Sequence, residues 1–495
     1  MTTLIGGEML LWSDTPVSGP ALRSLISPSS GCTLVAGTHA PDLLDAVPAA
    51  SLTVLVRGVP DAEALAATRP GVTVLCGSLE KLTAEPGYDT VVAFGGLDRL
   101  LSAEAEPLTW DETLALLLAV LKPGGRLLLG AENLFGLHRL VTLPSAPGDA
   151  DWVIPDDHDP RRPAGHAGLL ERITRAGLRI RRDYAGYPGL SSPTVLLSQE
   201  ILAESALVGA LEAVVATAVE PSVDVLADPV RLATGALRNG LAAELAPAWF
   251  IIADRLDASS DAAIPDAVID SQEVGITELP RGRTLQDHLL AAAQRRDLPV
   301  MRDLLTAWQG SPTADVPASQ IVVTETGGRA ETGGRAGSAN GLVEANGLVE
   351  LIALAPVGTP LTALRAFAAT AIAGGFAHLW PIPADEAELT AVLAGMTGRE
   401  LAPDQVPAAD PPAAHAVGDL LADRERLTRE LAEANAKHAY YEKMLLHREA
   451  ELKRVRQMNA LLSATVPGKA ATSLVGGLRA GKRAVRSVVR RTRGN

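Results

Sequence analysis

Short apolar runs alternate with amphipathic stretches through the first 200 residues. The runs that have the length and composition of strands are residues 32–36, 52–56, 72–76, 88–94 and 126–129, and helices are predicted at 42–46, 61–68 and 110–121. Continuous apolar strands that are separated by helices indicate a parallel sheet covered on both faces. The pattern therefore predicts an α/β fold with a Rossmann-like, doubly wound, mostly parallel sheet.

Two more strands are predicted after this alternation, at residues 178–184 and 194–198. They flank a loop that contains Tyr187, Pro188 and Gly189, which are residues typical of turns. We expect them to form an antiparallel hairpin at the edge of the sheet.

The rest of the chain divides by pattern and composition. Strands at 249–253 and 348–354 and helices at 284–295, 300–308, 361–373 and 386–396 indicate a smaller α+β unit. The predicted order is a Rossmann-like domain at 1–200, a helical connector at 201–248, this α+β domain at 249–400, and a Pro- and Ala-rich linker at 401–415.

A heptad pattern runs through residues 416–464. Fourteen positions alternate by three and four residues, and ten of them are Val, Leu, Ala or Tyr, with Arg424, His438, Arg448 and Asn459 as the exceptions. Such a seam with charged residues between its members predicts a C-terminal coiled-coil helix and a homodimer. The alternative is a long helix that packs on its own domain.

The last segment, residues 465–495, is basic. From Lys469 onward it has eight Lys and Arg and no acidic residue, although the net charge of the chain is -14. Leu474, Leu478 and Val485 lie near one helical face, so the segment is predicted to be an amphipathic tail that contacts an anionic membrane surface. An acidic partner, nucleic acid or a solvated tail are the alternatives. The acidic body argues against specific nucleic-acid binding by the main domains.

Composition narrows the class of protein. Apolar residues make up 47% of the chain and aromatic residues only 3%, which suits α/β layers better than a β-sandwich. No apolar run reaches the roughly 18 residues of a membrane span, and the first 20 residues do not resemble a secretory signal. We expect a cytoplasmic protein with its tail at the inner face of the cell membrane. Cys32 and Cys76 lie in predicted strands, so we expect buried side chains and neither a disulfide nor a metal site.

Residues 88–129 resemble the fourth strand, the next helix and the fifth strand of class I S-adenosylmethionine-dependent methyltransferases. The resemblance lies in the strand YDTVV and the turn LKPGGRLLL. Glu132-Asn133 and the stretch AGYPGLSSPTVLLS at 185–198 resemble a bacterial branch of this family that is found with cell-surface glycan and glycosyltransferase systems. The resemblance implies S-adenosylmethionine as the cofactor.

The resemblance also implies where the cofactor lies. The residues implied to contact it follow the first four strands and are Gly37, Asp61, Ser78, Leu79 and Gly95. The family's ribose-binding acid is expected near residues 56–57, and Asp61 is the first carboxylate after them. The loop after the first strand has one glycine where the family has three.

Two histidines are candidate catalytic residues. His138 follows the fifth strand, above the carboxyl ends of the strands where ligands bind in open sheets. His158 lies in an acidic run at 156–159. Either can serve as a general base toward a sugar hydroxyl, and the alternative for each is a solvated loop histidine. No spacing here matches a metal site.

The α+β domain carries a second, weaker resemblance. Residues 279–285 resemble the hinge of sugar and antibiotic kinases, and residues 346–351 resemble the strand after their catalytic loop. Phosphoryl transfer needs a base and a metal-binding Asp, and this chain has neither at the matching places. The resemblance therefore implies an inactive unit used for binding or packing.

The sequence thus predicts a methyltransferase that uses S-adenosylmethionine and a small-molecule or glycan acceptor, such as a surface-polymer precursor. The alternative is a non-catalytic, methyltransferase-like scaffold that assembles partners through its coiled coil and basic tail.

Overall fold

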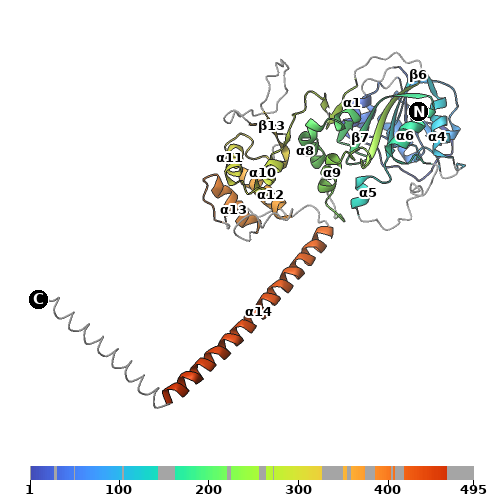
Figure 1. Cartoon of the computed structure of the whole chain (residues 1–495). Coiled ribbons are helices and arrows are strands. Elements are labelled where there is room, and N and C mark those ends of the chain that lie inside the picture. The colour runs from blue at the N-terminus through green and yellow to red at the C-terminus, as the bar shows by residue number, and fades with distance from the viewer. Residues whose placement is uncertain are drawn as a thin grey trace. The chain divides into compact units, whose positions relative to one another are not determined.

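The computed structural model forms two compact units, a main unit at Met1–Val417 and a C-terminal unit at Gly418–Asn495 (Figure 1). The residues it describes are 2–26, 31–48, 51–102, 105–106, 108–142, 162–219, 225–255, 264–270, 272–325, 349–353, 358–373, 385–402, 405–406 and 417–464.

Most of the strands and helices expected from the sequence lie close to their expected ranges, and the structure adds elements that were not expected, such as Thr2–Gly6, Gly165–Arg175 and Ile321–Glu325. The strands are β1 (Thr2–Gly6), β2 (Thr33–Ala36), β3 (Leu52–Val56), β4 (Thr73–Gly77), β5 (Tyr88–Ala93), β6 (Leu121–Glu132), β7 (Leu178–Tyr187), β8 (Val195–Ser198), β9 (Ala248–Arg255), β10 (Ala267–Ile269), β11 (Gln272–Val274), β12 (Arg283–Thr284), β13 (Ile321–Glu325) and β14 (Val349–Ala353). The helices are α1 (Pro20–Ile26), α2 (Pro41–Leu44), α3 (Val59–Thr68), α4 (Trp110–Ala119), α5 (Leu137–Val141), α6 (Gly165–Arg175), α7 (Gln199–Leu202), α8 (Val208–Ala218), α9 (Pro229–Arg238), α10 (Leu285–Gln294), α11 (Leu298–Gln309), α12 (Pro360–Ala373), α13 (Glu386–Met396) and α14 (Val417–Ala464).

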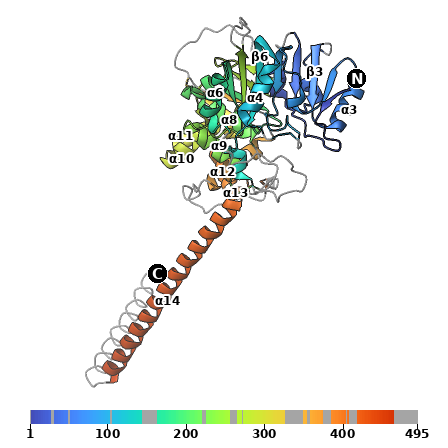
Figure 2. The ribbon, with the colours of Figure 1, turned by 90° about the vertical axis from the view of Figure 1, so that its right-hand side faces the viewer.

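Eleven of the described strands form one mixed sheet, in the order β1-β4-β3-β2-β5-β6-β9-β7-β8-β10-β11. Figure 2 labels β3 and β6 of this sheet. The strands from β1 to β6 pair in parallel, and the pairs from β6 and β9 onward are antiparallel. Counted from β2, the parallel strands follow the order 3-2-1-4-5 of a doubly wound sheet. The predicted fold class is confirmed, and a ligand crevice is expected between β2 and β5, where the strand order reverses.

Two apolar layers cover this sheet. Leu34 of β2 and Val91 of β5 face the layer that contains residues of α4, α6 and α8. Their neighbours Val35 and Val92 face the layer that contains residues of α1, α2 and α3. Because successive side chains of a strand point to opposite faces, the continuous apolar runs serve both layers.

The strand predicted at residues 249–253 corrects the expected division of the chain. It is part of β9, which pairs with β6 on one side and with β7 on the other, so it lies inside the main sheet and not in a separate domain. β7 and β8 are antiparallel as predicted, but β10 and β11 continue the sheet beyond β8. The hairpin is therefore not an edge of the sheet. The domain boundaries that were expected after residues 200 and 248 both fall within the stretch of chain that forms this one sheet.

The smaller α+β part follows β11. β12, β13 and β14 form an antiparallel sheet, and α10 to α13 surround a core that includes Trp308 and Phe367. The four helices predicted in this part are confirmed. Its β12 end approaches α8 closely, because a Cβ at Gly209 would lie 2.5 Å from the Gly282 carbonyl oxygen.

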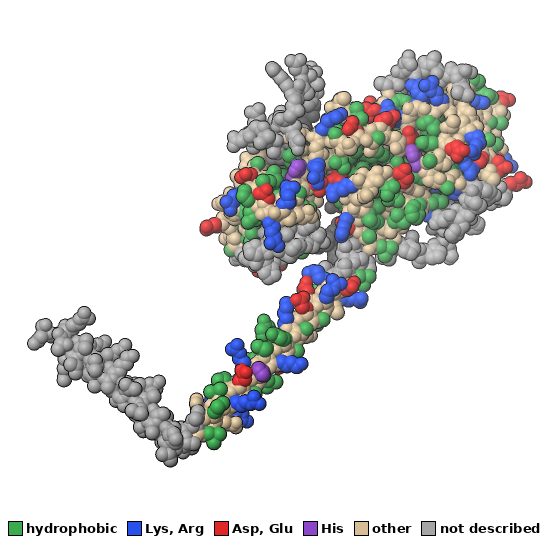
Figure 3. Space-filling model, in the orientation of Figure 1, with side chains coloured by type: hydrophobic (Ala, Val, Ile, Leu, Met, Phe, Trp, Pro, Cys, Tyr) green, Lys and Arg blue, Asp and Glu red, His purple; other side chains and the backbone are tan. Residues whose placement is uncertain are grey.

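The described residues of the C-terminal unit all belong to α14. It is one helix of 48 residues, which confirms the helix predicted at 416–464. Apolar and charged side chains are mixed along it (Figure 3), and the described side chains from 424 to 461 are exposed. Its pairing as a coiled coil stays a prediction.

Several expectations concern other parts of the chain. The basic tail at 465–495 and most of the linker at 401–415 lie outside the described residues. Among the described helices, none combines the length and the apolar character that a bilayer crossing needs. Both cysteines are free, and Cys76 is buried as predicted. Cys32 is exposed, which contradicts the prediction, because it precedes β2 and is not part of the strand.

Candidate functional site

A cavity of about 550 Å³ lies at the carboxyl ends of β2 and β5. Its walls come from an N-terminal segment, from the loops after β2, β5 and β6, and from the loop between β7 and β8, namely Asp14, Thr15, Val17, Ala36, Gly37, Thr38, Gly95, Gly96, Asp98, Arg99, Leu100, Glu132, His138, Arg139, Pro188, Gly189, Leu190, Ser191 and Ser192. This is the crevice that the strand order predicts, and its volume is within the range of small-molecule sites.

The N-terminal segment between β1 and α1 crosses the carboxyl ends of β3 and β2. Met9 forms a bridge with Gly58, and Val17 forms one with His39. The amide of Val17 donates to the carbonyl oxygen of Thr38 at 2.9 Å, and Val17 accepts from the amide of Ala40 at 2.8 Å. The segment is therefore a fixed wall of the cavity.

An ion pair holds this segment at the end of β3. Arg57, which directly follows β3, donates to Asp14 through Nε and Nη2, both at 2.7 Å. Its Nη1 donates to the carbonyl oxygen of Leu101 at 2.9 Å, and its guanidinium lies 5.7 Å from the ring centre of Trp12. Burial acts to raise the pKa of Asp14, but the hydrogen bonds from Arg57 and Trp12 and the charge of Arg57 outweigh it, so the pKa is lowered. Asp14 is thus an ionised carboxylate in the cavity wall.

Two of the predicted cofactor residues line the cavity. Gly37 has a φ of +91°, which favours glycine, and a Cβ there would meet only the Leu100 side chain, at 3.6 Å. On this side the backbone at Gly37 is therefore sterically uncovered, while its amide donates to the Leu55 carbonyl oxygen and its own carbonyl oxygen accepts from His39. Gly95 follows the neighbouring strand β5, and a Cβ there would approach the Val17 side chain to 3.3 Å.

The other three predicted cofactor residues bind other parts of the chain. Asp61 accepts hydrogen bonds from the Ser13 hydroxyl, from the Asp14 amide at 3.0 Å and from Thr38 Oγ1 at 3.3 Å. Ser78 is buried and its hydroxyl accepts from the amide of Ser102 at 2.9 Å. Leu79 is a buried core residue. None of the three lines the cavity.

A second carboxylate lies at the end of β6. Glu132 Oε1 accepts from His138 Nε2 at 3.1 Å and from Arg139 Nε at 3.0 Å. Burial acts to raise the pKa of Glu132, but the His138 hydrogen bond and the charge of Arg139 outweigh it and lower the pKa to about 2. Glu132 is therefore a hydrogen-bond acceptor, because a general base needs a pKa closer to the working pH.

The structure places His138 beside this carboxylate. Its Nδ1 is buried and has no hydrogen-bond partner within the described residues, and a Cβ at Gly136 would lie 2.9 Å from it. With Nδ1 against the backbone and Nε2 on Glu132, the ring holds the carboxylate in place. His158, the second candidate, lies outside the described residues.

The loop after β6 is fixed by the other member of the Glu132-Asn133 pair. Asn133 Nδ2 donates to the carbonyl oxygens of Glu244 and Ala246 at 2.7 and 2.8 Å, and its Oδ1 accepts from the amide of Phe135. Because residues 244–246 immediately precede β9, the insertion of that strand also positions the cavity wall.

Sequence reasoning missed Asp14 and Glu132 as site residues. Nothing local marks Asp14, because its partner Arg57 is 43 residues away. A signal for Glu132 was present in the sequence. Glu132 ends a strand next to the crevice, and together with Asn133 it carries part of the resemblance to the methyltransferase family. Among the described residues, no group of three His, Cys, Asp or Glu could hold a metal ion.

Comparisons with known proteins give a likeness in structure alone. No protein-family model and no curated protein matches the chain. The [4+2]-cyclase SpnF is 14% identical over 50% of this chain and 86% of its own, with a TM-score of 0.26. A putative methyltransferase in complex with the Trm112 activator of Haloferax volcanii is 14% identical over 49% and 91%, with a TM-score of 0.29. The 1,6-didemethyltoxoflavin-N1-methyltransferase of Burkholderia thailandensis, with bound S-adenosylhomocysteine, is 16% identical over 48% and 76%, with a TM-score of 0.25. Values this low say nothing about what this chain binds.

Proposed function

We propose that the cavity binds S-adenosylmethionine and that the protein is a methyltransferase. The observation that carries the proposal is the cavity at the carboxyl ends of β2 and β5. Its wall contains uncovered backbone at Gly37 and the carboxylates of Asp14 and Glu132. S-adenosylmethionine supplies a methyl group on a positively charged sulfur, which needs alignment with a nucleophile more than it needs an acid or a metal.

The residues of the cavity fit this ligand. Asp14 takes the place of the acid expected at the end of β3. Among the described residues, its Oδ2 accepts one hydrogen bond and its Oδ1 accepts two. This leaves an acceptor position on the carboxylate for a ribose hydroxyl. Glu132 accepts on Oε1 alone among the described residues, so Oε2 can accept from the ligand's ammonium group. The uncovered backbone at Gly37 lets the ligand lie close to the strand ends.

The acceptor we propose is a hydroxyl of a glycan or another surface-polymer precursor. Its support is the resemblance of residues 132–133 and 185–198 to the glycan-associated branch, and part of the second stretch, Pro188 to Ser192, lines the cavity. His138 serves here as a positioning residue for Glu132. To take a proton from the hydroxyl, its Nε2 would have to leave Glu132.

The rival function is a scaffold without a cofactor. It is favoured by Asp61, Ser78 and Leu79, since all three predicted contacts are engaged within the fold. The two functions differ in whether the cavity binds an adenosyl ligand.

Titration calorimetry of the full chain with S-adenosylhomocysteine tests this difference. We expect micromolar binding that Ser192→Trp weakens at least about ten-fold, because an indole would fill the cavity mouth. Ser205→Trp is the matched control, since Ser205 is exposed and does not line the cavity. Glu132→Gln should also weaken binding. No heat from the unsubstituted protein, or equal binding by both Trp variants, would favour the scaffold.

A further inference from the structure

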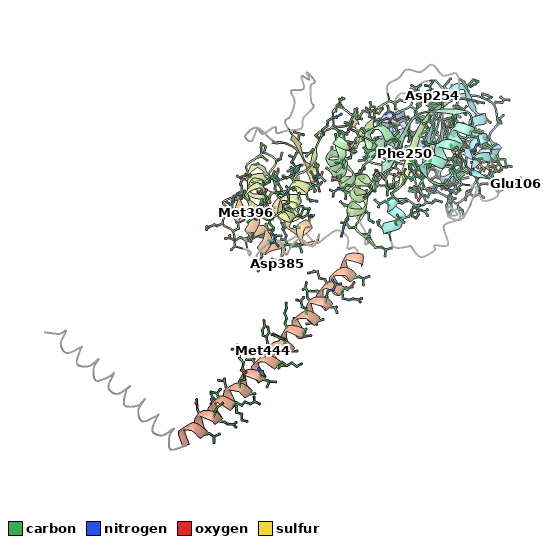
Figure 4. The ribbon with its side chains drawn as sticks, viewed as in Figure 1. Glu106, Phe250, Asp254, Asp385, Met396 and Met444 are labelled. Carbon is green, nitrogen blue, oxygen red and sulfur yellow. The ribbon has the colours of Figure 1, made fainter. Side chains whose placement is uncertain are left out.

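The C-terminal helix α14 presents an apolar seam that no described residue of its own unit covers. Leu427, Leu431, Tyr441, Leu445 and Leu452 belong to the seam, and each side chain has at least half of its surface exposed. Met444, marked in Figure 4, lies directly beside it. Exposed apolar surface of this extent marks a protein interface, and alternation by three and four residues is the spacing of a two-helix contact.

We propose that this seam binds α14 of a second copy of the chain, with the two helices parallel and in register. The argument for this partner is charge complementarity. Charged residues that flank the seam lie next to the partner helix. In a parallel pair, a flanking residue that comes directly before a seam residue faces the partner's flanking residue five positions later in the sequence. Lys437 then faces Glu442, and Glu451 faces Arg456, so each pair has opposite charges and occurs twice in the dimer.

The remaining described pairs of this kind bring no like charges together. Glu430 faces Asn435, and Met444 faces Glu449. At these described flanking positions, a second copy of the same helix therefore brings no like charges together. Within one chain, Lys437 pairs with Glu433 at 2.7 Å, so its ammonium group would be shared between the two helices.

Of the four polar residues inside the seam, Asn459 favours a parallel register, whereas Arg424, His438 and Arg448 would each meet their own copy. Asn459 would meet the Asn459 of the second copy, and an amide pair at this kind of seam position specifies two parallel strands in one register. Arg448 would meet the Arg448 of the second copy, and this contact of like charges costs stability. Glu449, the next residue, flanks the second copy's Arg448, so a carboxylate lies beside each guanidinium. The pairing is therefore specific, and its stability is reduced by the buried charge.

Disulfide trapping in the full chain tests both the partner and the direction. Cys32 is exposed and is replaced by Ser, and Cys76 is buried. Ala434→Cys lies in the seam, and Ala436→Cys is the matched control on the outer face of the same helix. Under mild oxidation we expect nearly complete covalent dimer for Ala434→Cys and almost none for Ala436→Cys.

Other outcomes would overturn the proposal. In antiparallel helices that overlap fully, the two copies of residue 434 would lie about 20 Å apart, far beyond the roughly 7 Å reach of a disulfide. A dimer that does not crosslink through Ala434→Cys contradicts the parallel direction. A monomer in light scattering of the unsubstituted chain contradicts the partner.

Charge reversal tests the flanking pairs independently. Lys437→Glu should weaken the dimer about ten-fold, and Glu442→Lys in the same chain should restore most of the loss, because both pairs regain opposite charges. Lys453→Glu is the control, since Lys453 also follows a glutamate by four residues but faces away from the seam. Equal weakening by Lys453→Glu, or no recovery in the double variant, would count against the proposed contacts.

Discussion

His39 shows how one side chain behind the cavity loop is tuned by its surroundings. Its Nδ1 donates to the Gly37 carbonyl oxygen at 3.0 Å, and its buried Nε2 has no hydrogen-bond partner within the described residues. Burial lowers the pKa of His39 to about 4, and the Gly37 carbonyl opposes this only in part. The folded state therefore favours the neutral form of the His39 imidazole.

The pH dependence of stability should report this shift. The unfolded chain binds a proton to His39 near pH 6.5 and the folded chain only near pH 4, so the free energy of unfolding falls as the pH falls between these values, by up to about 3 kcal/mol. His39→Asn, which can keep the bond to Gly37, should remove this part of the slope in urea unfolding at pH 4 to 7. His447→Asn is the control, because His447 is exposed on α14 and lies outside the seam. A slope that is unchanged in His39→Asn would contradict the assignment.

The candidate site also shows what sequence reasoning can and cannot reach at the residue scale. Gly37 and Gly95 could be predicted because a strand end and a glycine are local signals. Asp14 could not, since its place in the cavity depends on the distant Arg57. Asp61 was the nearest carboxylate along the chain, but the fold uses it to hold the N-terminal segment.

At the scale of elements, β9 decides how the sheet is built. Its Asp254, marked with Phe250 in Figure 4, is buried and faces Arg126 of β6 across the strand pair. It accepts from Arg126 Nε at 2.8 Å and from Arg181 Nη1 of β7 at 3.2 Å. One carboxylate thus joins three neighbouring strands, and a shift of β9 by one residue would separate these charges.

Removing that carboxylate should be costly. Asp254→Ala leaves the largely buried Arg126 without its ion-pair partner and removes one contact of Arg181, and we expect a loss of about 3 kcal/mol in the free energy of unfolding. The control is Glu171→Ala, which breaks an exposed pair with Arg175 and should cost less than about 1 kcal/mol. Similar losses for the two variants in denaturant unfolding would show that Asp254 does not hold the strands.

At the scale of the whole molecule, residues 1–200 do not contain a complete sheet. β7 has β9 on one side and β8 on the other, and β9 comes from residues 248–255. Without β9, the hydrogen-bonding edges of β6 and β7 and much of both apolar layers would be exposed, which favours aggregation.

Two truncated chains should therefore behave differently. A chain that ends at Glu200 should lack a cooperative thermal transition and aggregate, whereas a chain that ends at Val417 should keep the transition, because Met1–Val417 is a compact unit. Circular dichroism with size-exclusion chromatography measures both. A soluble, cooperatively folded 1–200 chain would contradict the role of β9.

The sequence by itself determined the positions of most elements, from the strands at 52–56 and 88–94 to the long helix at 416–464. Helix and strand periods are local, so they can be read without the partner segments. Only the tertiary structure decided that β9 enters the main sheet and that Asp14 reaches the end of β3. Both depend on pairings between segments far apart in the chain, and such pairings leave no period in the sequence. The place of the cavity thus follows from the strand order that the structure shows, and the side chains that line it were foreseeable from the sequence only in part.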